Sequence, residues 1–287
     1  MKRKTLHKSV IVYGKDIYGR DAWVEFEPMK DGQPGFYWKI PLATDPSKFE
    51  YIPIDWRIAF ASEKMHHIYL KYNCNILRIY EHIDALRNDG YDSIAISGTE
   101  WPPYEVTEFY RQKLLKQTVH SVVVEIPYFT FSKPYKSSFV DDDGLPRSFE
   151  IIPNNKSSMS VDAFVSFKKY AINGHIQSII TSDILDEVFP IGPPAIFPVY
   201  YWISKLCGFH YHKVVVRPSK NKEETGKKYA GHAVVDILGD INLLSHYMLP
   251  SCDIISSCSG HKQRLELIKE IGRNETLVKI TKPQLVG

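Results

Sequence analysis

The chain has 287 residues, a formal net charge of +3 and an apolar content of 44%. This length accommodates one large domain or two domains of about 120–150 residues each. The small net charge argues against a nucleic acid polymer as a partner. No run of about 18 apolar residues occurs, so we expect a soluble protein without a transmembrane segment.

The first residues and the cysteines indicate where the protein works. Residues 1–4 are basic, but no apolar stretch follows them, so no secretory signal is expected. The four cysteines show no C-x-x-C spacing, which favours reduced thiols. We therefore expect a cytoplasmic protein.

The first half of the chain reads as strands followed by helices. A helix is predicted over 81–88, and Gly90 suits the left-handed position that follows a helix end. A second helix is predicted over 105–117, where apolar residues recur at helical spacing. The predicted strands are rich in β-branched and aromatic residues and cover 9–13, 22–28, 68–70, 75–80 and 93–97.

The second half repeats this order. Strands are predicted over 121–126, 148–152, 163–167 and 214–217, and helices near 181–183, over 199–206 and after 259–260. A charged loop is expected over 219–228. In each half, predicted strands are followed by predicted helices, which is typical of an α+β fold. We therefore predict two domains of similar strand-then-helix topology, the first over 1–119 and the second over 120–287.

A polar stripe in an otherwise apolar segment carries the strongest functional signal. His232, Asp236 and Asp240 recur at i, i+4 and i+8, and therefore share one face of a helix. Buried imidazole and carboxylate groups are costly unless something compensates them. A zinc ion is one such compensation, since one helix can supply it with His and Asp four residues apart. An exposed helix start with one His and two acids is the alternative.

A second candidate lies in the first half. A catalytic zinc site needs a third ligand, an open position and a general base. The pair Glu81–His82 stands where a predicted strand turns into a helix, so it can supply both missing parts. Alternatively, Glu81 is an acid favoured by the helix dipole and His82 is a surface residue.

Together these motifs resemble those of the zinc-dependent UDP-3-O-acyl-N-acetylglucosamine deacetylases of lipid A synthesis, the LpxC family. The family's T-V-E-H-L-x-A-A-L pattern matches Ile-Tyr-Glu-His-Ile-Asp-Ala-Leu at 79–86. Its H-K-x-x-D-x-x-G-D-L pattern matches 232–241, and its later S-G-H matches 259–261. The order of the three motifs is the same. The resemblance implies two α+β domains packed together, with the site at their interface.

The resemblance also implies a role for each site residue. His82, His232 and Asp236 would bind Zn²⁺. Glu81 would be the general base and His261 the general acid, while Asp240 would orient His261. The implied activity is that of a zinc-dependent amidohydrolase. It would hydrolyse the N-acetyl amide of an amino-sugar conjugate such as UDP-3-O-acyl-GlcNAc, a small-molecule substrate.

The sequence departs from the family where substrate is recognised. Ala233 and Cys258 stand where the family has lysines that could meet a diphosphate. The family stabilises the oxyanion with a Thr, and the matching segment 190–197 contains none. These departures favour an altered substrate. They also leave a second hypothesis, a catalytically inactive zinc- or ligand-binding relative.

The resemblance further implies a βαβ insert in the second domain, over 197–216. Its aromatic residues could narrow an acyl tunnel, stack on a sugar or pack in the core. Within it, His210 and His212 alternate on a predicted strand and would share one face. They are more typical of a surface pair than of a second metal site.

Overall fold

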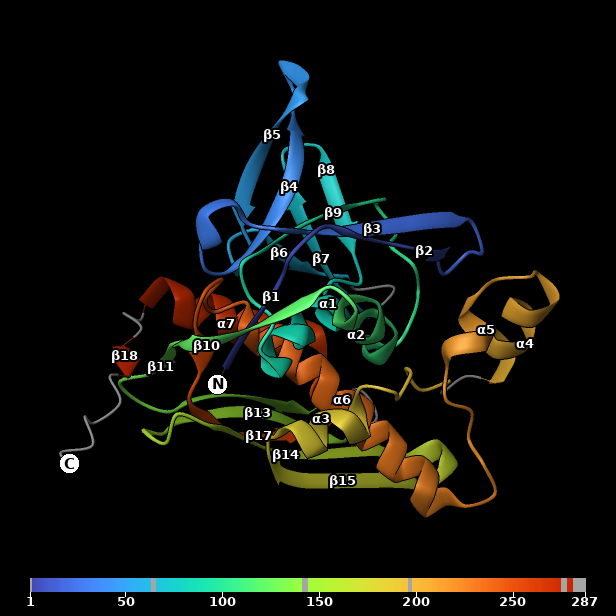
Figure 1. Ribbon diagram of the computed structural model, residues 1–287. Helices are drawn as coiled ribbons and strands as arrows, with labels where there is room; N and C mark the ends of the chain where they lie inside the picture. Colours follow the sequence, from blue (N-terminus) through green and yellow to red (C-terminus); the bar gives the residue numbers. More distant parts are fainter. Residues whose placement is uncertain (1, 63–65, 141–143, 196–197, 275–277, 281–287) are drawn as a thin grey trace.

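The computed structural model describes residues 2–62, 66–140, 144–195, 198–274 and 278–280. Strands and helices are mixed along the chain in an α+β arrangement, as the sequence predicts. Two five-stranded sheets form the outer layers, and most of the helices lie between them (Figure 1). The candidate site residues belong to this central helical layer.

The first large sheet has the strand order β2-β3-β9-β4-β5. Strand β3 alternates buried and exposed residues, and Ala22, Val24 and Phe26 point into the core. Strand β9 lies in the middle, antiparallel to β3 and parallel to β4. The bounds are β2 Val10–Lys15, β3 Asp21–Pro28, β4 Phe36–Leu42, β5 Asp45–Pro53 and β9 Ile94–Gly98.

The second large sheet has the order β12-β13-β17-β14-β15 and the same plan. The hairpins β12–β13 and β14–β15 flank the central strand β17, which is antiparallel to β13 and parallel to β14. The two halves of the chain therefore build sheets with the same strand order. The bounds are β12 Tyr135–Val140, β13 Pro146–Pro153, β14 Met159–Phe167, β15 Ile172–Ile179 and β17 Cys252–Ser257.

Three smaller sheets complete the strands of the described chain. Strands β6 (Ala59–Ala61), β7 (Ile68–Tyr72) and β8 (Asn75–Arg78) form one, and β16 (Leu249–Pro250), β11 (Tyr128–Thr130) and β18 (Val278–Ile280) another. Strand β1 (Lys2–Leu6) pairs antiparallel with β10 (Thr118–Glu125). The proposed boundary at 119/120 thus falls inside β10.

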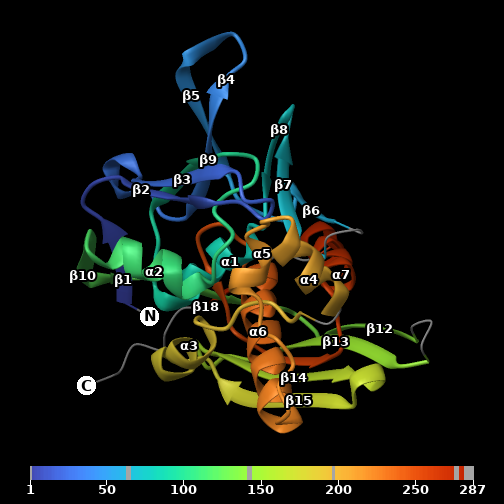
Figure 2. The ribbon, with the colours of Figure 1, turned by 90° about the vertical axis from the view of Figure 1, so that its right-hand side faces the viewer.

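Helix α6 (Lys222–Asn242) is the axis of the central layer. It packs on β14, β15, α1 and α7 (Figure 2), and its apolar face is fully buried. The polar stripe therefore stands in a buried environment, as its apolar neighbours predict. The other helices are α1 Glu81–Asp84, α2 Thr107–Leu115, α3 Ser182–Val188, α4 Pro198–Leu206, α5 Tyr211–Val214 and α7 His261–Asn274, with 3₁₀ turns at Lys30–Gly32, Ala85–Asp89 and Lys168–Tyr170.

Helix ends agree with the sequence in some places and differ in others. Gly90 adopts φ 92° after the helical segment, as predicted, although that segment is α1 followed by a 3₁₀ turn. The charged loop predicted over 219–228 is wrong from residue 222, because α6 starts there. The side chain of Asn221 caps this start by accepting a hydrogen bond from the backbone N–H of Glu224.

The predicted βαβ insert over 197–216 is also wrong. Its described residues form two helices, α4 and α5, and the strand predicted over 214–217 is only a bridge between Pro194 and Val216. Pro193 and Pro194 have no N–H to donate to a strand ladder, and Pro218 follows the segment, so a strand cannot extend. His210 and His212 consequently lie at α5 and not on a strand face.

No helix in the described part of the chain is long and apolar enough to span a lipid bilayer.

Helices α1 and α6 approach each other closely at Gly239. A Cβ atom placed there would lie 2.2 Å from the backbone oxygen of Glu81. We therefore expect Gly239→Ala to lower the free energy of unfolding by about 1–3 kcal/mol, because one helix backbone must move. Urea unfolding measures this change.

Gly231→Ala in the same helix is the matched control. The nearest atom to its new Cβ is the tip of the Ile191 side chain, which can move. Alanine also favours the helix by about 1 kcal/mol. Equal destabilisation by both substitutions would contradict the close approach of α1 and α6.

Candidate metal centre

Two helices bring the three predicted metal ligands together. Helix α1 carries His82, and α6 carries His232 and Asp236; one ligand atom from each lies within 4.8 Å of the others. His232 Nε2 is 3.3 Å and His82 Nε2 is 3.8 Å from Asp236 Oδ1. Both imidazoles are buried, and their rings stand at 89° with centroids 5.2 Å apart. The fold thus places residues 150 positions apart in one cluster.

Backbone carbonyls orient both imidazoles. His82 Nδ1 lies 3.3 Å from the carbonyl oxygen of Glu105, and His232 Nδ1 lies 3.3 Å from that of Ile191. A carbonyl only accepts, so each Nδ1 donates and each Nε2 keeps its lone pair toward Asp236. Metal-binding histidines in proteins are held in this way by their other nitrogen.

Asp236 Oδ1 is a buried oxygen without a hydrogen-bond partner among the described residues. Such an atom is costly unless a cation or donor meets it. Burial opposes the charged form of Asp236, but His232 and His261 hold the pKa of its carboxyl well below the usual range. Burial, followed by His232, lowers the pKa of His82 to about 4. A carboxylate with two imidazoles is a donor set that fits Zn²⁺.

Glu81 stands beside this cluster on α1. It is 3% exposed, and its Oε2 accepts a hydrogen bond of 3.0 Å from the backbone N–H of Ile68. Its Oε1 lies 3.9 Å from His261 Nε2. Burial raises the pKa of Glu81 to about 8. A carboxyl group with a raised pKa beside a ligand cluster is a candidate proton acceptor.

His261 is the first residue of α7, and its side chain also lies beside the cluster. Its Nε2 is 3.5 Å from Asp236 Oδ2, and its Nδ1 is 2.9 Å from both oxygens of Asp240. Burial opposes protonation of the ring, but Asp240 and Asp236 raise the pKa of His261 to about 10. The imidazolium form can therefore donate a proton from Nε2.

Two residues of this environment were not predicted from the sequence. Arg264 is 2% exposed; its Nε donates to Asp240 Oδ2 at 2.5 Å and its Nη1 to the carbonyl of Ser259 at 2.7 Å. Its i, i+3 spacing from His261 is the signal that could have found it. Tyr104 is buried, and its pKa rises well above 10 through burial, Tyr211 and the charges of Glu81 and Asp236.

His210 and His212, which were predicted as a surface pair, are not members of the three-ligand group. His210 Nε2 pairs with Glu105 Oε1 at 2.9 Å and so joins α5 to the segment before α2. His212 Nδ1 donates to the carbonyl of Phe209 at 2.6 Å. Neither forms a second three-ligand group in the described part of the chain.

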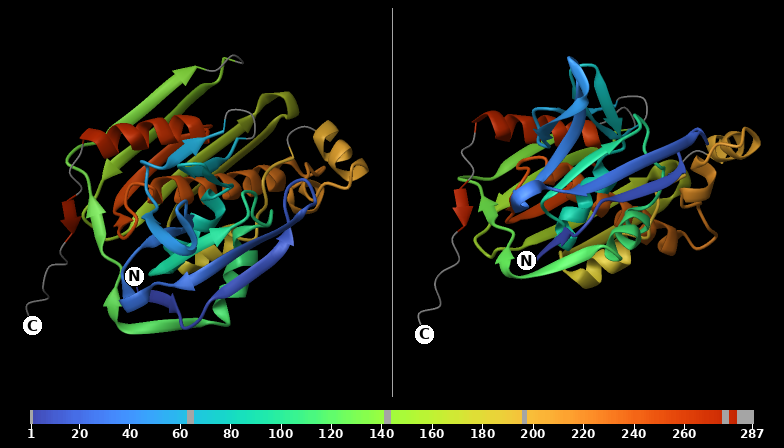
Figure 3. Two further views of the ribbon diagram at one scale, coloured as in Figure 1. Left: turned by 90° about the horizontal axis from the view of Figure 1, so that it is seen from above. Right: turned by 45° about the horizontal axis from the view of Figure 1, so that its top comes forward.

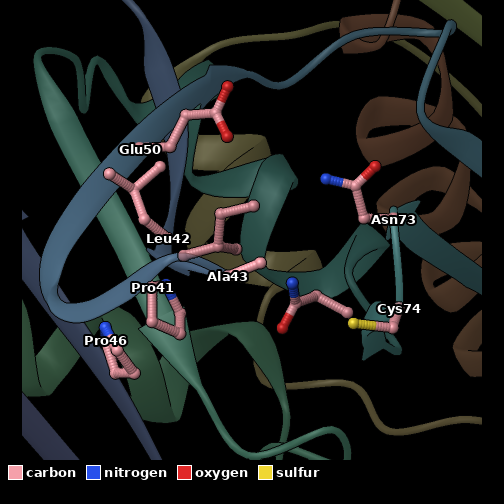
Figure 4. Close-up of a pocket in the computed structure, with 9 residues that line it drawn as sticks. Pro41, Leu42, Ala43, Pro46, Glu50, Asn73 and Cys74 are labelled. Atoms are coloured by element: carbon pink, nitrogen blue, oxygen red, sulfur yellow. The ribbon is translucent and has the colours of Figure 1, made fainter.

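A pocket of about 220 Å³ lies elsewhere, between the β4–β5 hairpin and the β7–β8 turn (Figure 4). Prolines, Glu50 and the exposed Cys74 line it, and it includes none of the residues of the cluster.

Neither a comparison with protein-family models nor a comparison with curated proteins finds a match for this chain.

Proposed function

We propose that this protein is a zinc-dependent amidohydrolase that removes the acetyl group from the nitrogen of an amino-sugar conjugate. The observation that carries the proposal is the buried, unpartnered Oδ1 of Asp236 between two oriented imidazoles. A proton acceptor and a proton donor, Glu81 and His261, adjoin it from different helices. A purely structural zinc site needs neither of these groups.

His82, His232 and Asp236 would hold the metal. Zn²⁺ bound there supplies Lewis-acid chemistry, which polarises an amide carbonyl and makes water more acidic. Glu81 takes the proton from the attacking water. His261 gives its Nε2 proton to the departing nitrogen, which is a poor leaving group until it is protonated. Asp240 accepts from His261 Nδ1 and keeps the ring aimed at the site.

The repeated strand order supports a relationship to the LpxC family. Helix α1 precedes the central strand β9 in the first half, and α6 precedes the central strand β17 in the second. The two helices that carry the ligands thus hold equivalent places in the two halves. We propose that these halves are the two domains, 1–119 and 120–287, and that the site lies at their interface.

The substrate we propose is an N-acetylated sugar or sugar nucleotide, with or without an acyl chain. Ala233 lies on α6 beside His232, and Cys258 precedes α7, where the family has lysines. Without these two cations, a nucleotide diphosphate loses charge-assisted contacts. An amino-sugar conjugate other than UDP-3-O-acyl-GlcNAc is therefore the preferred form of the proposal.

We propose Tyr104 as a donor in place of the missing oxyanion Thr. The phenol is buried, and burial, Tyr211 and the negative charges of Glu81 and Asp236 raise its pKa well above 10. Tyr104→Phe removes only the hydroxyl, so we expect kcat to fall about 10²-fold with little change in KM. Steady-state amine release measures both constants. A fall in kcat/KM due to KM alone would contradict this role.

One experiment tests the proposed function. The purified protein is analysed for metal and then assayed for amine release from UDP-linked and free N-acetylglucosamine and from their 3-O-acylated forms. We expect one zinc per chain and release that a chelator stops and added zinc restores. A zinc-loaded protein that releases no amine from any of these conjugates would support the inactive, zinc-binding relative.

A further inference from the structure

Helices α4 and α5 form a hairpin that projects from the side of the molecule (Figures 1 and 3). The hairpin is internally braced, because Ser204 Oγ accepts from the backbone N–H of His212 at 3.0 Å and donates to the carbonyl of Phe209. Its base is tied by the backbone N–H of Val216, which donates to the carbonyl of Pro193 at 2.8 Å. The hairpin is therefore an ordered projection.

The outer face of α4 is apolar. Val199, Trp202, Ile203 and Leu206 stand at i, i+3, i+4 and i+7 and are 64%, 49%, 45% and 85% exposed. These positions form one stripe along the helix. The polar Ser204 is 3% exposed and faces inward. An amphipathic helix normally buries its apolar face, so this stripe needs a partner outside the described chain.

The segment that contains the stripe is rich in cations and lacks acids. Residues 188–222 contain no Asp or Glu, and their cationic residues are Lys205, Lys213, Arg217, Lys220 and Lys222. The Arg217 guanidinium lies 4.3 Å from the ring centre of Tyr201 and 5.6 Å from that of Trp202. Lys205 Nζ lies 5.4 Å from the same Trp202 ring. Apolar side chains are thus flanked by cations on one projecting element.

We propose that the α4–α5 hairpin docks the protein on a bilayer surface that contains anionic lipid. Trp and aliphatic side chains enter the boundary of the acyl chains, while Lys and Arg stay at the level of the headgroups. A second copy of the chain fits less well, because two such hairpins would bring cations without acids against each other.

The docked hairpin would stand next to the candidate metal centre. His210 of the hairpin pairs with Glu105, whose carbonyl oxygen orients His82, and Tyr211 stacks on Tyr104 at 6.0 Å. The hairpin is therefore connected to His82 through Glu105. The docking itself does not depend on the proposed activity.

Vesicle cosedimentation tests the proposal. The probes are vesicles of phosphatidylcholine alone and vesicles that also contain phosphatidylglycerol. We expect binding to the second kind, weakened by high salt, and little binding to the first. Leu206→Asp should lower the vesicle partition coefficient by about tenfold or more, since it removes apolar area and adds a negative charge.

Leu115→Asp is the matched control, since Leu115 is 50% exposed and also ends a nine-residue helix, α2. It should bind as the unchanged protein does. A fluorophore on the exposed Cys207 should shift to the blue with anionic vesicles, and one on the exposed Cys74 should not. Equal binding by both Leu variants, or absence of binding, would overturn the proposal. Self-association that Leu206→Asp abolishes, without vesicle binding, would identify a second copy as the occupant.

Discussion

Replacement of Glu81 by Gln is expected to lower kcat for amine release by about 10²–10⁴-fold. The side chain is buried and accepts a hydrogen bond from the backbone N–H of Ile68, which the amide oxygen of Gln can also accept. The fold and the proposed metal ligands are therefore kept. The substitution removes the carboxylate oxygen that takes a proton from water in the proposed mechanism.

Three measurements separate this role from a structural one. Zinc content and the midpoint of thermal unfolding should stay close to those of the unchanged protein, while kcat falls. Glu150→Gln is the control, because Glu150 is on a sheet strand and pairs with Lys136 away from the cluster. Unchanged turnover in zinc-loaded Glu81→Gln protein would exclude Glu81 as the general base.

Replacement of Asp240 by Ala is expected to lower the free energy of unfolding by about 3–5 kcal/mol. Asp240 is fully buried and accepts from His261 Nδ1 at 2.9 Å and from Arg264 Nε at 2.5 Å. Without it, the buried guanidinium of Arg264 loses its nearer counter-charge and keeps only Asp236, whose Oδ2 is 4.0 Å from Nη2. Amine release should fall as well, because His261 loses the group that aims its ring.

Asp162→Ala provides a matched control for this prediction. Asp162 also pairs with an imidazole, His175, at 2.7 Å, but this pair on the second sheet is open to solvent, with side chains 34% and 53% exposed. An exposed pair contributes about 0–1 kcal/mol, so the control should unfold nearly as the unchanged protein does. Chemical denaturation of both variants gives the two values. A loss of less than about 1 kcal/mol in Asp240→Ala would show that Arg264 is compensated by other groups.

Local patterns predicted much of the secondary structure. The β-branched and aromatic composition of 22–28 predicted β3, and the helical spacing of apolar residues over 105–117 predicted α2. The spacing of His232, Asp236 and Asp240 predicted a shared face on a buried helix, and α6 has this form. The prediction of a strand over 214–217 is wrong because the neighbouring prolines limit strand pairing, and the predicted loop over 219–228 is wrong from residue 222 because Asn221 caps a helix there.

The sequence by itself determined which residues could bind a metal and move protons, because the side-chain types and their helical spacing are local properties. Only the tertiary structure decided that these residues meet. Glu81 and His82 approach α6 because Gly239 has no Cβ to keep the two helix backbones apart. The contact of Arg264 with Asp240 and those of the Glu105 and Ile191 carbonyls with the two imidazoles also depend on tertiary packing, since each joins segments that are distant in the sequence.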